Sequence, residues 1–436
     1  MARKSTRSLT SRLLAYPAQP LPEGTSVAVI GGGLAGCSAA NALATRGMRV
    51  LLYEREPAVA TQTSNHPAAV VFPMAAKQAT TLRAFYEAAY HAILAKIAVM
   101  QRHTPFCEWQ QTGAIHLLVN DRLAHLWENL AGTGMPSADF QRWTGAQTAA
   151  ATGGLIEAPA LAYPTAGYIQ PPAWCEALCQ HPNIQVKLHQ SALQLEADRE
   201  GWQVTTSQNT SKAAAVVIAN GLEALRFEQT SWLPLNCFRG QLAYIDLNHA
   251  PQWAPQVICH EGYLIPDCGT GHLAGATFHP ADRDPNLKPE SQDHLITQIR
   301  RWLPWFLKGE PELKGRVAFR AQSPDHLPMA GPVANYQEWV KDFAGFHHGK
   351  AGQKYPAPTY HQNLYVSTGH ASRGTVSCWL AGEILASKIA GAGPVLDPHQ
   401  CAQLNPARFI LRALKRDQSL TIPPIPPDEL PQRLPY

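Results

Sequence analysis

The stretch that decides the fold is "VAVIGGGLAGCSAANALATRGMRVLLYE", residues 27–54. Its pattern predicts a buried strand at Val27–Ile30, a helix of small and apolar residues at Leu34–Thr45, and a second strand at Val50–Tyr53. A strand, a helix and a strand in this order form the βαβ unit with which many nucleotide-binding domains begin. The sequence therefore predicts a nucleotide-binding domain near the N-terminus.

Three glycines connect the first strand to the helix. Gly31 allows a tight turn, Gly33 lets the backbone approach a pyrophosphate, and Gly36 lets the helix pack closely on the sheet. The helix N-terminus offers N–H groups and the positive end of a dipole to the phosphates. Glu54, at the end of the second strand, can accept hydrogen bonds from both ribose hydroxyls. This combination indicates FAD or NAD and disfavours NADP.

The composition indicates a folded protein with two domains or one large elaborated domain. The chain has 436 residues, of which 45% are hydrophobic and 16% are charged, and this excludes a fully disordered chain. The nine cysteines show no C-x-x-C spacing, so we expect no metal site, no disulfide framework and a cytoplasmic location. No apolar run is long enough to span a bilayer, so no membrane partner is expected. The net charge of +4 permits a nucleic-acid partner without requiring one.

The later segments alternate between two patterns. Buried strands recur in "AAAVVIANG" (213–221) and at Leu364–Thr368, whereas "QLAYIDL", "GYLIPD" and "GHLAGATF" (241–278) indicate antiparallel sheet. A helix is expected at Thr80–Met100, and another with a proline break in "RRWLPWFL" (300–307). We predict an α/β fold, in which a discontinuous Rossmann-type domain carries an inserted substrate domain of antiparallel β-sheet plus helices.

The expected domains follow from this alternation. The nucleotide-binding domain comprises residues 24–80, 160–235 and 345–416, and the substrate domain comprises residues 81–159 and 236–344. A basic N-terminal arm at residues 1–23 precedes them, and a Pro-rich tail at residues 417–436 follows.

Several later motifs resemble one flavoprotein family. "FRGQLAYI", "GYLIP", "GHLAGATF", "GRVAFRAQSPDHLPMAGP" and "LYVSTGHASRGTVS" follow the glycine loop in the order typical of D-amino-acid-oxidase-like flavoproteins. With "LNPARFILRALKR", they resemble most closely the C-terminal oxidoreductase half of the MnmC family of bifunctional tRNA-modifying enzymes. The similarity extends over residues 24–416. It implies a D-amino-acid-oxidase-like fold with FAD as the cofactor.

The resemblance also implies a reaction. MnmC-type oxidoreductases remove the carboxymethyl group from 5-carboxymethylaminomethyl-(2-thio)uridine at the tRNA wobble position, and they leave the aminomethyl nucleoside and glyoxylate. The expected partner is tRNA with that modified uridine. The chain has no room for the methyltransferase half, so either a separate methyltransferase is a further expected partner or the product is not methylated. Two alternatives are a free glycine, sarcosine or D-amino-acid-type FAD oxidase or dehydrogenase, and a flavin-containing RNA-binding protein without turnover.

Four residues are candidates for the substrate side. By resemblance, Arg320 matches the arginine that holds the substrate carboxylate, a role that suits a guanidinium, although a structural ion pair is the alternative. Tyr263 faces the same pocket or is a packed aromatic of the sheet. Lys77 matches a lysine near the flavin, or it is a solvated lysine at a helix start. Arg239 contacts substrate or RNA phosphate, or it ties two domains together.

Residues from several segments are expected to bind the cofactor. Arg55 follows Glu54 in the first unit, and Gly221 ends the strand of "VVIANG". By resemblance, Ala192 belongs to the strand whose backbone meets the adenine. Also by resemblance, the segment "TQTSNHPAA" (61–69) runs along the flavin, although the family usually has glycines there. Its candidate residues are Thr63, Ser64 and Asn65.

A late loop completes the expected cofactor site. "LYVSTGHASRGTVSCWLAGEILA" (Leu364–Ala386) predicts a strand, a small polar loop and a helix. By resemblance, the loop lies against the flavin ring, with the helix N-terminus at the ring edge that becomes negative on reduction. An ordinary strand–helix turn is the alternative. The candidate residues are Gly369, His370, Ser372, Arg373, Gly374 and Thr375. Basic residues of the last helix are candidates for RNA contact or for a solvated face; they are Arg408, Arg412, Lys415 and Arg416.

Overall fold

The computed structural model describes residues 12–16, 19–74, 80–103, 109–129, 139–269, 271–311, 314–348 and 354–420. The chain divides into two compact units. Unit 1 comprises the described parts of 1–61, 175–237 and 320–430, and unit 2 comprises those of 62–174 and 238–319. These limits differ from the expected domain boundaries near residues 80, 160 and 345. Which ligand each domain binds stays a prediction.

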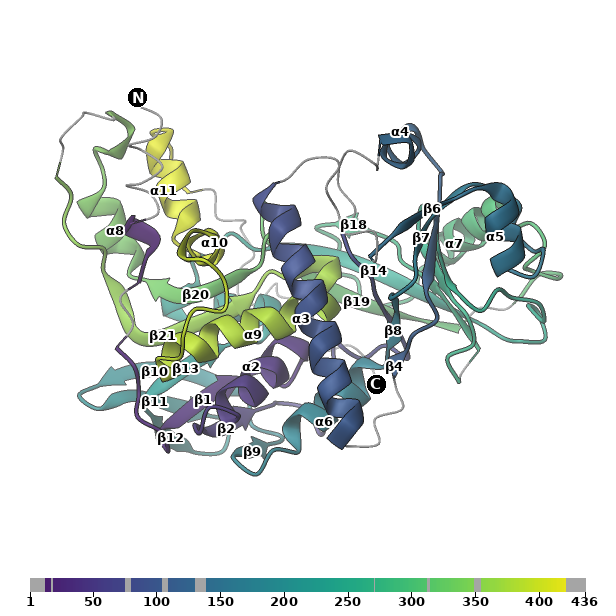
Figure 1. Cartoon of the computed structure of the whole chain (residues 1–436). Helices are drawn as coiled ribbons and strands as arrows, with labels where there is room; N and C mark the ends of the chain where they lie inside the picture. Colours follow the sequence, from purple (N-terminus) through teal and green to yellow (C-terminus); the bar gives the residue numbers. More distant parts are fainter. Residues whose placement is uncertain are drawn as a thin grey trace. The chain divides into compact units, whose positions relative to one another are not determined.

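Unit 1 is built on a six-stranded sheet (Figure 1), in the order β20-β21-β13-β1-β2-β9. Its strands are β1 (Ser26–Ile30), β2 (Arg49–Tyr53), β9 (Ile184–Lys187), β13 (Ala215–Ile218), β20 (Met329–Ala334) and β21 (Tyr360–Thr368). Neighbours pair in parallel except β20, which runs antiparallel to β21. The central strands β1 and β13 are buried along almost their whole length, as continuous apolar runs in parallel sheets are.

Two helices of small residues pack together in unit 1. They are α2 (Leu34–Ala44) and α9 (Gly374–Ala390), which Figure 1 shows side by side. A Cβ at Gly382 of α9 would lie 2.8 Å from the carbonyl carbon of Ser38, so glycine permits the close approach. Val376, Leu380 and Ile384 are buried as expected, but the rest of α9 is largely buried too. The helix therefore lies inside the unit and not on its surface.

The remaining elements of unit 1 extend this core. A three-stranded sheet contains β10 (Ala192–Asp198), β11 (Gly201–Thr206) and β12 (Thr210–Ala213). The helices are α8 (Tyr336–Asp342), α10 (Pro398–Leu404) and α11 (Arg408–Lys415), with the short helices η2 (Gly221–Arg226), η3 (Glu228–Thr230), η4 (Phe346–His348) and η5 (Ala371–Arg373). Helix α6 (Pro171–Cys179) begins in unit 2 and ends in unit 1.

Unit 2 is built on a nine-stranded sheet, ordered β18-β14-β17-β16-β15-β5-β7-β6, with β19 paired to β14. Its strands are β5 (Ala114–Leu117), β6 (Gln141–Trp143), β7 (Ala160–Tyr163), β14 (Asn236–Ile245), β15 (Val257–Cys259), β16 (Tyr263–Ile265), β17 (His272–Gly275), β18 (His279–Pro280) and β19 (Lys314–Gln322). The expected antiparallel pairings of β14, β16 and β17 are confirmed. The predicted α/β fold is therefore confirmed, with a mainly parallel sheet in unit 1 and a mainly antiparallel sheet in unit 2, where β5 and β15 pair in parallel.

Each face of the large sheet carries an apolar cluster. Leu242, Cys259 and Ile265 belong to one cluster, and Ile258 and Leu264 belong to the other. The second cluster contains residues of α7 (Pro289–Trp302). The other elements are α3 (Thr81–His103), α4 (Asp121–Asn129), α5 (Gly145–Ala151) and a small sheet of β3 (Ala69–Val71), β8 (Gly167–Ile169) and β4 (Trp109–Gln110).

Two local predictions differ from the structure. The helix expected over residues 300–307 is wrong, because α7 starts at Pro289 and ends at Trp302. Leu303 leaves the helical conformation since the ring of Pro304 disfavours it there. Part of the N-terminal arm is folded: Leu13 and Leu14 are buried, and the Leu14 carbonyl accepts a hydrogen bond of 2.9 Å from Asn405 Nδ2.

Candidate functional site

The glycine turn between β1 and α2 has no room for side chains. Gly31 has a φ of +101°, and a Cβ there would lie 2.8 Å from Cα of Asn220. A Cβ at Gly36 would lie 1.7 Å from the carbonyl oxygen of Gly31. The N-terminal cap of α2 is Gly33, so no side chain covers the start of the helix. The turn thus leaves the backbone accessible at the positive end of a helix, where phosphates bind.

Glu54 lies against this turn at the end of β2. Its Oε2 accepts a hydrogen bond of 2.7 Å from the N–H of Gly32, and its Oε1 accepts one of 3.0 Å from the N–H of Glu56. Burial raises the pKa of Glu54, while these backbone N–H groups and Arg55 oppose the shift. The glycine turn and the carboxylate are therefore fixed next to each other, as a pyrophosphate and its adjoining ribose require.

The strand β13 ends beside the same turn. Gly221 has a φ of +65°, and its carbonyl accepts a hydrogen bond of 3.0 Å from Thr368 Oγ1. Asn220 Oδ1 is buried and has no hydrogen-bond partner in the part of the chain that the structure describes. Such a group is expected where a ligand supplies the missing donor. Sequence reasoning named this strand only through Gly221 and missed Asn220.

Arg55 follows Glu54 in sequence, and a backbone hydrogen bond holds the segment just before Ala192 against Glu54. Arg55 Nε is 3.1 Å from Glu56 Oε1, and its Nη1 is 3.2 Å from Glu223 Oε2. Ala192 is the first residue of β10 and is half-buried. The backbone returns to Glu54 just before it, because Gln190 N–H donates to the Glu54 carbonyl at 2.9 Å. The contacts of these residues with the cofactor stay predictions.

His370 holds the late loop in place through contacts with two serines. Its Nδ1 lies 2.8 Å from Ser377 Oγ, and its Nε2 lies 3.2 Å from Ser367 Oγ. Ser377 donates its only hydroxyl hydrogen to the Arg373 carbonyl at 2.9 Å. His370 Nδ1 must therefore carry a proton and Nε2 must accept from Ser367. Burial lowers the pKa of His370 to about 4, so the ring is neutral at pH 7.

His370 thus points into unit 1 and shapes the loop through two serines that sequence reasoning did not name. Gly369 has a φ of +75°, which only glycine adopts readily. Ser372 is exposed, and Arg373, Gly374 and Thr375 are half-buried at the start of α9. Their placement between β21 and a helix N-terminus agrees with the expected strand, loop and helix. Their contact with the flavin stays a prediction.

Strand β19 links several predicted residues. Thr63 Oγ1 donates a hydrogen bond of 2.9 Å to the Phe319 carbonyl, so Thr63 lies beside this strand, while the contacts of Ser64 and Asn65 with the flavin stay predictions. Within unit 1, Gln322 at the end of β19 forms an isolated antiparallel bridge with His370. Arg320, two residues earlier, is half-buried. The strand that carries Arg320 therefore reaches the late loop.

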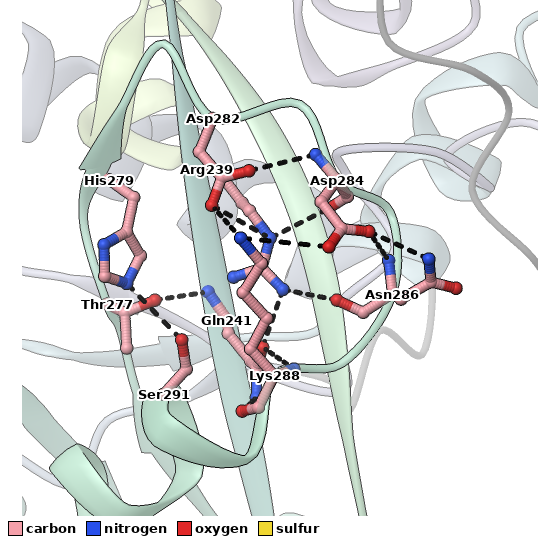
Figure 2. A network of polar contacts seen from close by, with 9 residues as sticks. All are labelled: Arg239, Gln241, Thr277, His279, Asp282, Asp284, Asn286, Lys288 and Ser291. Atoms are coloured by element: carbon pink, nitrogen blue, oxygen red, sulfur yellow. Dashed lines mark hydrogen bonds and ion pairs between the residues drawn. The ribbon is translucent and has the colours of Figure 1, made fainter.

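Arg239 is fully buried inside a loop of unit 2 (Figure 2). Its Nε donates to the Asp284 carbonyl at 2.8 Å, and its Nη2 donates to Gln241 Oε1 at 2.8 Å and to the Asn286 carbonyl. Asp282 adds an ion pair at 3.8 Å. Figure 2 shows this loop wrapped around the guanidinium. These contacts explain Arg239 as a residue that holds the loop, and its contact with substrate or RNA stays a prediction.

The other two substrate-side candidates are Tyr263 and Lys77. Tyr263 on β16 lies over Gly275, because a Cβ at Gly275 would be 2.8 Å from the tyrosine hydroxyl. Gly275 therefore leaves the space that the ring needs. Lys77 lies outside the described residues. No group of three or more His, Cys, Asp or Glu side chains in the described ranges is arranged to hold a metal ion.

The basic residues expected to contact RNA include one that cannot reach it. Arg408 is 2% exposed, and its Nε and Nη2 each lie 2.9 Å from a carboxylate oxygen of Asp325. Arg412 pairs with the same carboxylate. The candidacy of Arg408 for RNA contact is therefore wrong, because its guanidinium neutralises a carboxylate that lies 83 residues away in sequence. Lys415 and Arg416 are both exposed.

The residues of unit 1 fit a bound dinucleotide. A Cβ at Gly31 or Gly36 would clash with neighbouring backbone atoms. The Glu54 carboxylate is fixed beside the turn, and Asn220, whose Cα lies against Gly31, has a buried acceptor in its Oδ1. The helix N-terminus supplies the field that phosphates need. This set of donors and acceptors agrees with a bound dinucleotide.

Known proteins resemble the chain in sequence. The family described as DAO, FAD dependent oxidoreductase, matches residues 26–388. The tRNA 5-methylaminomethyl-2-thiouridine biosynthesis bifunctional protein MnmC of Stutzerimonas stutzeri (strain A1501) is 33% identical over 411 residues, which cover 92% of this chain and 61% of that protein. The same-named protein of Pseudomonas savastanoi pv. phaseolicola (strain 1448A / Race 6) is 32% identical over 414 residues, with the same shares. The chain thus spans about three fifths of the length of these curated relatives.

Solved structures resemble the chain in fold. The glycine oxidase from Geobacillus kaustophilus has a TM-score of 0.69 at 20% identity, and the match covers 89% of this chain and 99% of that one. The L-proline dehydrogenase from P. horikoshii has a TM-score of 0.66 at 16% identity, with the same coverage. These similarities confirm the fold that the sequence motifs predicted.

Proposed function

The chain belongs to the FAD dependent oxidoreductase family, and from this premise we propose that it acts on tRNA. The reaction is the oxidative removal of the carboxymethyl group from 5-carboxymethylaminomethyl-(2-thio)uridine at the wobble position. FAD, the cofactor expected from the sequence, is confirmed by the family match. The tRNA substrate rests on one observation: 33% identity, over 92% of this chain, with a protein named for 5-methylaminomethyl-2-thiouridine biosynthesis in tRNA.

The substrate side chain is an N-substituted glycine, and this defines the chemistry. When bound, FAD supplies a two-electron acceptor for the C–H bond next to nitrogen. The oxidised substrate is an imine, which water splits into the aminomethyl nucleoside and glyoxylate. The nucleoside thus keeps its nitrogen, and the two carbons of the carboxymethyl group leave together. These two steps, oxidation and hydrolysis, require no nucleophile from the protein.

The residues of the chain bind and orient the reactants. The glycine turn and Glu54 would hold the pyrophosphate and ribose of FAD. The late loop, fixed by His370, would present the N-terminus of α9 to the flavin. Arg320 would hold the substrate carboxylate through a two-pronged contact, which brings the N-methylene carbon into a fixed position. Support for this role is the position of Arg320 on β19, two residues before the bridge to His370.

Two partners follow from the proposed reaction. The first is tRNA with a carboxymethylaminomethyl wobble uridine. The second is a methyltransferase, which would convert the aminomethyl product into the methylaminomethyl nucleoside for which the relatives are named. We place the reaction in the cytoplasm, where tRNA is modified. In the described part of the chain, no helix has the length and apolar character to cross a membrane.

Nucleoside mass spectrometry of tRNA tests the proposal in cells. A strain that lacks the gene should accumulate the carboxymethylaminomethyl nucleoside and lose the aminomethyl product. A variant with Arg320→Met should give the same pattern, and a variant with the exposed Arg301→Met should restore the product. An unchanged nucleoside profile in the deletion strain would contradict the proposal.

Experiments with the purified protein distinguish two other functions from the proposed one. Reduction of the bound flavin by free glycine, sarcosine or proline, without reduction by the modified tRNA, would identify an oxidase of free amines. Tight binding of the tRNA without any change in the flavin spectrum would identify an RNA-binding flavoprotein without turnover.

A further inference from the structure

Gln190 follows β9 and lies against the end of β2. Its backbone N–H donates a hydrogen bond of 2.9 Å to the carbonyl of Glu54. In the sheet of unit 1, β9 is the neighbour of β2, and β2 is the neighbour of β1. The glycine turn, Glu54 and Gln190 therefore follow the ends of three adjacent parallel strands. In sheets of this kind, a nucleotide binds across the carboxyl ends of the strands.

A chain of hydrogen bonds fixes the orientation of the Gln190 side-chain amide. Gln208 Nε2 donates to the His189 carbonyl at 3.1 Å, and a carbonyl can only accept. Gln208 therefore presents its Oε1 to Gln190, whose Nε2 donates to it at 3.2 Å. Because a carboxamide has one nitrogen and one oxygen, the atom of Gln190 that remains for another contact is the acceptor Oε1.

This oxygen is buried and lacks a donor. Gln190 is 9% exposed, and its Oε1 has no hydrogen-bond partner among the residues that the structure describes. A buried carbonyl oxygen without a donor is costly, and a bound ligand can supply the missing N–H or O–H. The missing partner is therefore a hydrogen-bond donor that binds beside Glu54.

The adenine of FAD carries such a donor. The Glu54 carboxylate suits the hydroxyls of the adenosine ribose, and the helix N-terminus after β1 suits the pyrophosphate. The base and the pyrophosphate are attached to opposite ends of the ribose, so the base extends from β2 towards β9. Its exocyclic amino group donates hydrogen bonds, whereas guanine and hypoxanthine have an acceptor oxygen at the same ring position.

We propose that Gln190 Oε1 accepts a hydrogen bond from the adenine amino group of FAD, and that this contact selects adenine over bases with an oxygen at that position. Two acceptors placed opposite each other both stay without a donor, so a glutamine held in this orientation rejects the other bases. Gln208 is a positioning residue, because its contact prevents the amide of Gln190 from turning over. The proposal concerns the cofactor and does not depend on the tRNA substrate.

Competition between two dinucleotides tests the contact. The FAD-loaded protein is equilibrated with equal concentrations of FAD and of its deaminated analogue, in which hypoxanthine replaces adenine, and the bound flavins are separated and quantified. The original protein should prefer FAD by at least about tenfold. Gln190→Leu keeps a similar volume without the acceptor, so the preference should fall by about tenfold. An unchanged preference in Gln190→Leu would overturn the inference.

Two further variants separate this contact from a general disturbance of the site. Gln185 is exposed on β9, and Gln185→Leu should keep the original preference. Gln208→Leu lets the amide of Gln190 turn its nitrogen towards the base, so it should lower the preference although Gln190 is still present. Flavin release on dilution, followed by fluorescence, gives the affinity of each dinucleotide separately. An equal loss of affinity for both dinucleotides in Gln190→Leu would show that Gln190 does not contact the amino group.

Discussion

At the scale of single residues, His370 acts by fixing the backbone around it. The ring is neutral because its surroundings exclude water, and its two serine contacts assign one nitrogen as donor and the other as acceptor. A histidine in a cofactor loop is easily interpreted as a ligand or a base. Here it holds a strand end and a helix start together, so we expect its loss to disturb the loop before it disturbs the chemistry.

The buried histidines predict a loss of stability in mild acid. Burial lowers the pKa of both His370 and His260 to about 4, against about 6.5 in the unfolded chain. Between pH 6.5 and 4 the unfolded state binds protons that the folded state does not, so the free energy of unfolding falls as pH falls. Each histidine contributes up to about 3 kcal/mol of this loss. Urea unfolding between pH 7 and 5 measures it, and a slope unaltered by His370→Gln would refute the assignment.

The glycine turn predicts a sharp difference between two similar substitutions. Gly36→Ala should push a Cβ into the Gly31 carbonyl, shift the turn and lower the flavin content of the purified protein by more than about tenfold. Gly393→Ala is the control, because no atom lies within 4 Å of its Cβ position. The ratio of flavin to protein absorbance measures the effect. A fully flavinated Gly36→Ala protein would show that the turn does not hold the cofactor.

What the sequence could predict at this scale depends on how local each interaction is. Gly36 and Glu54 were recognisable because their contacts lie within one βαβ unit. The surroundings of Arg239 and Arg408 were not, because their partners are 45 and 83 residues away. No periodicity or spacing in the sequence indicates that two such distant residues are in contact.

At the scale of elements, the start of α9 defines the electrostatics of the late loop. A helix N-terminus and the Arg373 guanidinium both favour negative charge nearby. Arg373→Ala should therefore lower the midpoint potential of the bound flavin by on the order of 30 mV, the equivalent of about 1.4 kcal/mol in a two-electron couple. Arg373→Lys should retain most of the potential. Spectroelectrochemical titration gives the value, and an unchanged midpoint in Arg373→Ala would place this arginine away from the flavin.

The docking of α11 depends on one half-buried carboxylate, that of Asp325. Arg408 and Arg412 hold the pKa of Asp325 at about 2, against the opposing effect of burial. Asp325→Asn should lower the free energy of unfolding by about 3 to 5 kcal/mol, because it leaves Arg408 buried without a counter-charge. The exposed pair of Asp198 and Lys212 provides the control, since Asp198→Asn should leave the unfolding midpoint unchanged. Equal midpoints for the two variants would mean that the pair of Asp325 and Arg408 contributes no stability.

The boundaries of elements show where a sequence pattern is reliable. The first strands and helices were predictable because apolar runs, glycines and small residues mark them. The helix expected at residues 300–307 was wrong because it was expected to continue past the break at Pro304. In the structure the amphipathic helix precedes the proline, with Leu295 and Ile299 buried. A proline thus ended the helix that it was expected to interrupt.

At the scale of the whole molecule, the two units are discontinuous in sequence. Strands β14 and β19 each have residues in both units, so the limits of the units fall inside strands. Sequence patterns change at turns and not within strands. The alternation of parallel and antiparallel segments was therefore predictable, while the residues at which the chain passes from one unit to the other were not.

In the proposed reaction, the bound flavin oxidises the wobble side chain of tRNA. The most direct test mixes the FAD-loaded protein, without oxygen, with one equivalent of tRNA that carries carboxymethylaminomethyluridine. We expect full bleaching of the oxidised flavin spectrum and one glyoxylate per flavin, with no bleaching by the same tRNA lacking the carboxymethyl group. An oxidised flavin that persists with the modified tRNA, and no glyoxylate, would contradict it.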